Sequence, residues 1–312
     1  MGLTQEQLKD LRPDMFVPQQ AEEGAAEIIS RPPTTYWQDA WRRLKMNKLA
    51  MAGLFTIIIL VILAIFGPYL SKFSYSDQNL VMTNQPPSAT YWFGTDELGR
   101  DLFTRIWYGA RISLLIGIVT SFITLVIGVL YGGIAGLAGG KVDDVMMRIV
   151  EILWAIPFLL YVILLMVVMG SGLKTIFIAL GAVYWMGMAR IVRGEILSLK
   201  EREYVLAARL LGASPWRILM YHLIPNAMGP IIIQMTLAIP EAIFTEAFLS
   251  FLGLGVSAPM ASWGVLASEG MAGIRSFPWQ IFFPAFFITV TMSSFNFLGD
   301  GLRDALDPRM RK

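Results

Sequence analysis

The sequence has no cysteine and only one histidine, His222, among its 312 residues. Without cysteine there is no disulfide, no iron–sulfur centre and no thiol nucleophile, and a single histidine argues against a histidine-built metal site. We therefore expect no bound metal. Charged residues are also scarce, at 15% of the chain, and no basic run is interleaved with aromatic residues, so no nucleic-acid partner is expected.

Nucleotide-binding and catalytic motifs are missing as well. Gly140 and Lys141 are followed by Val142, and Ala135 stands where a G-x-x-x-x-G-K-[ST] loop has its first glycine. Nothing resembles a Ser/His/Asp arrangement, and we interpret His222 as a polar interface residue. The chain is therefore predicted not to be an enzyme and to bind no cofactor of its own.

Long apolar stretches are what the sequence does have. Hydrophobic residues form 55% of the chain and the mean hydropathy is +0.59, which is too apolar for an ordinary soluble domain. A helix of about 20 apolar residues can cross a bilayer. The sequence thus predicts an all-α polytopic membrane protein with six transmembrane helices, over residues 49–66, 112–138, 146–169, 175–191, 225–248 and 279–298.

Composition divides the chain into three regions. Residues 1–36 have the mixed polar composition of a poorly ordered cytoplasmic tail. Residues 37–48 predict an amphipathic interfacial helix, which either lies on the membrane surface or simply anchors the first span. Residues 49–312 form the transmembrane domain, which also holds the polar extracytoplasmic segment 69–111 and the loop 200–224.

Two connections and one bend are predicted inside the transmembrane domain. A short helix within residues 92–114, with Leu102, Phe103, Ile106 and Trp107 apolar, is expected at the start of the second span, and Asp101 lies four residues before Arg105. The third span should bend near Pro157, because proline interrupts helical hydrogen bonding. Residues 251–278 contain Gly, Pro and Ser and are expected to form a loop.

The basic residues predict the orientation. Of the 25 lysines and arginines, 19 fall on the side of the two termini and 6 on the opposite side. Because basic residues are retained on the cytoplasmic side, both termini and the loop 200–224 are expected to be cytoplasmic.

The stretch 203–226, EYVLAARLLGASPWRILMYHLIPN, is a polar, helix-patterned interruption between two apolar segments. It predicts a helix over 203–211, a turn at Gly212, and a second helix over 215–222 that Ser214 caps and Pro215 starts. A slim helix pair of this kind suits the groove of a partner protein.

The spacing of Ala207, Ala208 and Gly212, followed by Ile-Pro-Asn, resembles the EAA loop of bacterial ABC importer permeases. The family pattern usually has Glu before the two alanines, where this chain has Leu206. The resemblance implies that this coupling loop docks on an ATPase subunit through Glu203, Tyr204, Ala207, Ala208, Arg209, Gly212, Ala213, Arg217 and Pro225.

Three further stretches, FGTDELGRDLFTRIWYGARISL, EAFLSFLGLGV and NFLGDGLRDALDPRMR, resemble the C-type permeases of the oligopeptide, dipeptide and nickel uptake group. The resemblance implies a type I ABC importer permease fold, a peptide cargo and alternating access. It also implies a homologous B-type permease subunit, two cytoplasmic ATPases that bind ATP and Mg, and an external substrate-binding protein. A nickel-complex importer, an ion-coupled secondary transporter and a non-transporting membrane anchor stay as alternatives.

Two sets of residues inside the spans each allow two interpretations. Gly128, Gly132 and Gly136 recur every fourth residue, which permits close helix packing either within the chain or at a gate or subunit seam. Glu241 and Glu246 project about 140° apart, and each is either part of a path that accepts the positively charged end of a substrate or a buried hydrogen-bond acceptor.

Overall fold

The computed structural model describes residues 35–307, so the predicted tail at 1–36 lies almost wholly outside the described residues. The chain divides into two compact units, residues 1–39 and 40–312, and all packing described below lies within the second unit. The helices, in chain order, are α2 (Tyr36–Met46), α3 (Lys48–Phe66), η2 (Gly67–Tyr69), α4 (Leu102–Ala138), α5 (Gly140–Ala155), α6 (Phe158–Met169), α7 (Leu173–Leu199), α8 (Glu203–Leu210), α9 (Pro215–Ile218), η3 (Leu219–Leu223), α10 (Ile224–Asn226), α11 (Met228–Phe251), α12 (Trp263–Ala272) and α13 (Trp279–Leu306).

Within residues 35–307, five helices are long and apolar enough to cross a membrane, namely α3 with η2, α4, α7, α11 and α13. A sixth crossing requires α5 and α6 together, and these two helices meet at an angle of 80°. The break lies at Ile156 and Pro157, whose backbone is extended, so the predicted bend at Pro157 is present and is sharp. The architecture agrees with the predicted all-α membrane fold.

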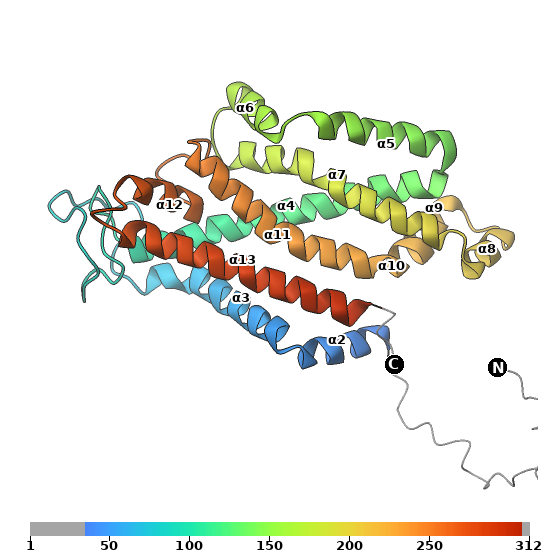
Figure 1. The fold of residues 1–312 in the computed structure, drawn as a ribbon, viewed down its shortest axis with the longest axis horizontal. Coiled ribbons are helices and arrows are strands. Elements are labelled where there is room, and N and C mark those ends of the chain that lie inside the picture. The colour runs from blue at the N-terminus through green and yellow to red at the C-terminus, as the bar shows by residue number, and fades with distance from the viewer. Residues whose placement is uncertain (1–34, 308–312) are drawn as a thin grey trace, which may run out of the picture. The chain divides into compact units, whose positions relative to one another are not determined.

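The long helices run alongside one another, with α4 against α7 and α11 between α4 and α13 (Figure 1). The glycines of α4 make the α4 and α7 contact close. A Cβ on Gly128 would lie 2.6 Å from the Cβ of Met188, and one on Gly136 would lie 2.9 Å from the Cβ of Ile196. Gly132 faces the backbone of Ala189. The face of α4 that these glycines leave without side chains therefore packs against α7 of the same chain.

The predicted start of the second span at residue 112 is wrong, because α4 begins ten residues earlier, at Leu102. Asp101 caps this helix by accepting a hydrogen bond from the Thr104 amide at 3.0 Å. Arg111 donates to the Ala64 and Ile65 carbonyls at 2.6 Å, at the end of α3. The short helix predicted within residues 92–114 is thus the first part of α4, and its charged residues have partners that hydropathy does not reveal.

The prediction of a loop over 251–278 is also wrong in part, because α12 lies within it. Ser262 caps α12 by accepting from the Val265 amide, and Trp263 is fully buried, with its indole N–H donating to the Ile106 carbonyl at 3.0 Å. One buried tryptophan therefore fastens α12 to α4.

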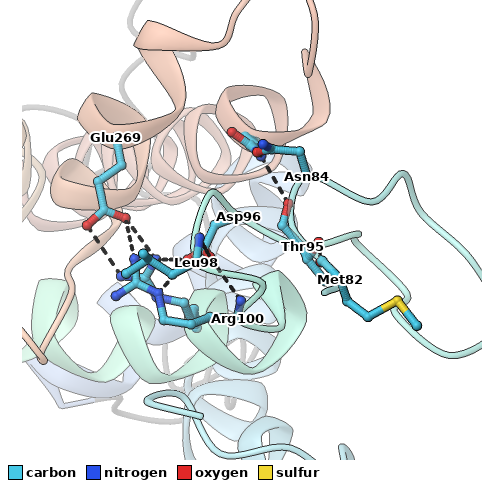
Figure 2. Close-up of polar contacts among 9 residues, drawn as sticks. Met82, Asn84, Thr95, Asp96, Leu98, Arg100 and Glu269 are labelled. Atoms are coloured by element: carbon cyan, nitrogen blue, oxygen red, sulfur yellow. Dashed lines mark hydrogen bonds and ion pairs between the residues drawn. The ribbon is translucent and has the colours of Figure 1, made fainter. Parts of the chain in front are cut away.

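A polar cluster fixes the segment between η2 and α4 to α12 (Figure 2). Asp96 pairs with both Arg100 and Arg105, and Glu269 of α12 also lies within salt-bridge distance of both arginines. Arg105 therefore pairs with Asp96 and Glu269 rather than with Asp101. Its side chain is only 2% exposed, whereas that of Glu269 is 43% exposed, so this end of the bundle is held by a partly buried ion-pair network.

Candidate coupling element and cavity

Helices α8 and α9 form a short helix pair with the turn that the sequence predicts. Gly212 has a φ of +79°, the left-handed conformation that glycine adopts without strain, and the Ala213 amide donates to the Ala208 carbonyl at 3.0 Å. Ser214 caps α9 by accepting from the Arg217 amide at 3.3 Å. We call residues 203–226 the coupling element.

The second predicted helix, 215–222, is shorter and less regular than expected. The α-helical part α9 ends at Ile218, and the chain continues as a π-helical turn in which the Ile224 amide donates to the Leu219 carbonyl. Pro225 follows directly and has no amide hydrogen to continue the α-helical register, which is consistent with the wider turn. The Asn226 side chain then donates to the His222 carbonyl at 2.5 Å, which places the lone histidine at this junction.

One side of the coupling element is anchored in the bundle. Val205, Ile218, Leu219 and Leu223 are buried in an apolar cluster with residues of α4, α7 and α11. Ala208 and Ala213 are partly buried against the same cluster. Movement of this element would therefore be passed to the long helices through packed side chains.

The opposite side of the coupling element is uncovered. The side chains of Leu210 and Leu211 are 90% and 88% exposed, and Trp216 and Tyr221 are 56% and 75% exposed. Neither leucine is among the site residues predicted from the sequence. The sequence pattern that could have identified them is a pair of large apolar residues directly before the turn glycine. Neither residue is needed there to pack the short helix against the bundle.

The predicted coupling residues divide between these two sides. Ala208 and Ala213 lie toward the bundle, whereas seven others are exposed: Glu203, Tyr204, Ala207, Arg209, Gly212, Arg217 and Pro225. Partial burial raises the pKa of the Tyr204 phenol, and the nearby Arg202 opposes this effect, so the phenol is neutral at physiological pH. A groove of about 710 Å³ lies beside the element, and its lining includes Arg209 and Trp216 of the element and Ile134 and Leu137 of α4.

A second cavity, of about 330 Å³, lies where α5, α7 and α11 approach one another. Its lining includes Trp154, Tyr184, Gly187, Gln234 and Glu241. The Tyr184 hydroxyl lies 2.5 Å from the Thr245 hydroxyl and 3.4 Å from the Glu241 carbonyl oxygen. Glu241 is an exposed residue of this lining.

Glu246 lies in a different environment from Glu241, as their angular separation on the helix predicts. It is fully buried, and one carboxylate oxygen accepts from the Ser250 hydroxyl at 2.6 Å and the Ser262 hydroxyl at 2.5 Å. Ser262 is also the cap of α12. Glu246 therefore joins α11 to α12, and Glu241 is the carboxylate of the pair that lines a cavity.

Comparison with known proteins gives two family matches. Residues 128–312 match the family described as binding-protein-dependent transport system inner membrane component. Residues 35–87 match the N-terminal transmembrane domain of oligopeptide transport permease C. A chain of the methionine ABC transporter MetNI, solved in inward-facing conformations, aligns with a TM-score of 0.52 at 19% identity, over 64% of this chain and 94% of that chain. At this identity the likeness concerns the fold alone.

Curated relatives extend the match to nearly the whole chain. The dipeptide transport system permease protein DppC of Bacillus subtilis (strain 168) is 57% identical over 308 residues, which cover 98% of this chain and 96% of the relative. The oligopeptide transport system permease protein OppC of the same organism is 54% identical over 305 residues, which cover 98% and 100%. The chain therefore belongs to the family of binding-protein-dependent transport system inner membrane components, as a permease subunit of the DppC and OppC type.

Proposed function

We propose that this chain forms half of the translocation pathway of an ATP-driven importer of dipeptides or oligopeptides. The observation that carries the proposal is the identity of 57% and 54% to permeases of dipeptide and oligopeptide transport systems, over almost their full length. These relatives favour peptide over a nickel complex as the cargo. The chain acts as a permease and not as an enzyme, because its relatives are permeases.

The proposed assembly places two cytoplasmic ATPases, which bind ATP and Mg, against the coupling element. A homologous B-type permease subunit completes the pathway, and an external substrate-binding protein delivers the peptide. Both termini are proposed to be cytoplasmic, in the inner membrane of a bacterium, because 19 of the 25 basic residues lie on that side. The coupling element then faces the compartment that holds ATP.

The structure of the coupling element supports a mechanical role. Leu210 and Leu211 present apolar surface to a partner, whereas Val205 and Leu223 fix the same element to the bundle. Leu206, at the position where the family usually has Glu, is 43% exposed and adds to the apolar face. ATP-driven closure of the ATPases would push this face, and α10 would pass the displacement into α11.

The two glutamates of α11 are assigned different roles in this proposal. Glu241 lines the pathway, because it is an exposed residue and belongs to the lining of the cavity between α5, α7 and α11. Glu246 is a structural acceptor that holds α12 to α11, because both serine hydroxyls reach the same carboxylate oxygen.

Uptake into proteoliposomes that contain the purified complex and the binding protein tests the proposed function. We expect accumulation of labelled dipeptide that requires ATP hydrolysis and does not respond to a proton or sodium gradient. A non-hydrolysable ATP analogue is the matched control. Uptake driven by an ion gradient without ATP would instead support a secondary transporter, and no uptake under any condition would support a membrane anchor.

A further inference from the structure

The groove beside the coupling element has an almost wholly apolar lining. It includes Ile134 and Leu137 of α4, together with Trp216 and Leu219 of the element. Its volume of about 710 Å³ falls within the range of about 300–1,000 Å³ that is common for small-molecule sites. Among the described residues of this lining, Arg209 is the one that carries a charge. The groove therefore combines an apolar surface with a single guanidinium.

The Arg209 side chain has no acidic partner within residues 35–307. It is exposed, and no ion pair joins its guanidinium to a carboxylate in this part of the chain. A guanidinium carries five N–H donors and pairs in a two-pronged manner with phosphate or carboxylate oxygens. The groove thus presents a positive charge that an anionic group can neutralise.

The α4 side of the groove continues an exposed apolar face of a membrane-spanning helix. Ile127 and Ile134 are both exposed, and because they lie seven residues apart they share one face of α4. Ala138, four residues after Ile134, extends this face into the groove. The apolar stretch predicted to cross the bilayer, 112–138, ends at the same residue. The groove therefore opens where the apolar part of the span ends.

The groove also lies at the depth of the lipid headgroups. Figure 1 shows α8 and α9 at one end of the bundle and α12 at the other, and the first end is cytoplasmic in the proposed topology. Tryptophan is enriched at the boundary between acyl chains and headgroups, and arginine side chains there extend toward the polar surface. Trp216 and Arg209 are thus the residue types that this boundary favours.

We propose that the groove binds one anionic phospholipid of the cytoplasmic leaflet, with an acyl chain against Ile134, Ala138 and Trp216 and the headgroup phosphate at Arg209. A soluble anion would leave the apolar lining without a partner, and an apolar protein segment would leave the guanidinium without a counter-charge. A phospholipid supplies both groups. The lipid contacts α4 and α9 together, so the anionic lipid content of the membrane regulates how firmly the coupling element is held to the bundle. This inference rests on the orientation given in the proposed function and not on the peptide cargo.

The test uses the assembled complex in proteoliposomes that contain phosphatidylglycerol with a photoreactive acyl chain. After illumination, mass spectrometry locates the crosslinked peptides, and the measurement is repeated with a phosphatidylcholine probe. In the wild type, residues 134–138 and 213–219 should carry more adduct from phosphatidylglycerol than from phosphatidylcholine. Arg209→Gln should lower this preference about five-fold, the effect of one basic residue near an anionic surface, and Arg209→Lys should retain it. Because each ratio is taken within one variant, a general loss of folded complex cancels.

Two further variants separate the apolar part of the site from its charge. Ala138→Trp should lower the yield from both probes, because an indole in place of the exposed Ala138 side chain fills the groove. Arg303→Gln is the matched control, since Arg303 is an exposed cation near the end of α13 and is not among the residues that line the groove. It should leave both yields unchanged.

The regulatory consequence is measured in the same proteoliposomes. Substrate-stimulated ATP hydrolysis should depend on the phosphatidylglycerol content in the wild type and lose this dependence in Arg209→Gln. A lipid preference that Arg209→Gln leaves unchanged, or capture of an ATPase instead of lipid by a photoreactive amino acid in place of Ala138, overturns this inference. ATP-dependent peptide uptake together with either result leaves the proposed function standing, whereas the expected lipid preference without any peptide uptake overturns the proposed function alone.

Discussion

Arg193 of α7 and Asp143 of α5 form a bidentate ion pair in which the Nε and Nη2 atoms each lie 2.6 Å from a carboxylate oxygen. The Asp143 side chain is 7% exposed and the Arg193 side chain 33%. The bidentate geometry and the partial burial make this pair stronger than an exposed one. The pair fixes the start of α5, the first half of the bent helix pair, against α7.

Replacement of Asp143 by Asn should therefore loosen α5 and destabilise the chain. We expect the free energy of unfolding to fall by about 2 kcal/mol, because the variant leaves a partly buried guanidinium without its carboxylate. This value allows for the partial exposure of Arg193, which weakens the pair. The thermal unfolding of the purified protein in detergent measures this loss. Glu151→Gln is the control, since the Arg148 and Glu151 side chains are 74% and 52% exposed and their pair should contribute much less. Equal shifts in the two variants would contradict the assigned role of Asp143.

The glycines of α4 predict a position-dependent effect of adding a single methyl group. Gly132→Ala should destabilise the chain by about 1–3 kcal/mol, because the new Cβ would meet the backbone of Ala189, which cannot turn aside as a side chain can. Gly194→Ala on the neighbouring helix meets nothing within 4 Å and should be neutral or stabilise α7 by up to about 1 kcal/mol. The unfolding temperatures of the two variants test this prediction. An unchanged unfolding temperature in Gly132→Ala would show that α4 and α7 do not pack this closely.

The ion-pair network around Arg105 predicts the behaviour of residues 70–101. Glu269→Ala removes the carboxylate that α12 contributes, so among residues 35–307 Asp96 remains as the ion-pair partner of Arg105 and Arg100. We expect faster amide hydrogen exchange in residues 70–101 and in α12, with little change in α8 and α9. Glu97→Ala provides the control, because Glu97 is exposed and adjacent to the same network. Unchanged exchange in Glu269→Ala would mean that other contacts hold this segment.

The sequence predicts those features that depend on neighbouring residues along the chain. The turn at Gly212, the Ser214 cap and the break at Pro157 follow from backbone conformation, and each is present in the structure. Hydropathy predicts the apolar part of each long helix but not where the helix ends. In the structure, α7 continues to Leu199 and α13 to Leu306, beyond the predicted ends of these spans.

Features that depend on distant partners could not be predicted in this way. The first part of α4 is polar in sequence, yet Arg105 is buried because Glu269, 164 residues away, pairs with it. Helix α12 is short, and Trp263 holds it to α4 across 157 residues. The spacing of Glu241 and Glu246 predicts that they lie on different faces of α11, but it does not reveal that Ser262 donates to Glu246 or that α5 contributes to the cavity lining beside Glu241.

The exposed leucines of the coupling element predict a variant that separates coupling from folding. Leu211→Asp should abolish stimulated ATP hydrolysis and weaken co-purification of the ATPases, because it places a charge on the apolar face proposed to enter their cleft. Its unfolding temperature should stay close to that of the wild type, since the side chain is 88% exposed. Leu80→Asp, at a residue 70% exposed in the segment between η2 and α4, is the matched control and should retain the ATPases. Full retention of the ATPases by Leu211→Asp would remove this face from the interface.

Ala208 tests the anchored side of the same element. Because Ala208 is partly buried against the apolar cluster of α4, α7 and α11, a bulky side chain cannot fit without displacing α8. Ala208→Trp should therefore abolish substrate-stimulated ATP hydrolysis while the spans stay folded, as circular dichroism would report. Normal stimulation in Ala208→Trp would contradict the tight coupling of α8 to the bundle.

The most direct test of the account is a crosslink from the tip of the coupling element. The native sequence contains no cysteine, so Leu211→Cys provides a single reactive site in this chain without any background substitution. In the assembled complex, a thiol crosslinker should join position 211 to an ATPase subunit with a yield that changes with the bound nucleotide, whereas Leu80→Cys should give no such product. Failure of position 211 to crosslink to an ATPase in every nucleotide state, or its labelling in intact cells by a membrane-impermeant thiol reagent, would contradict the proposal that ATP drives transport through this element.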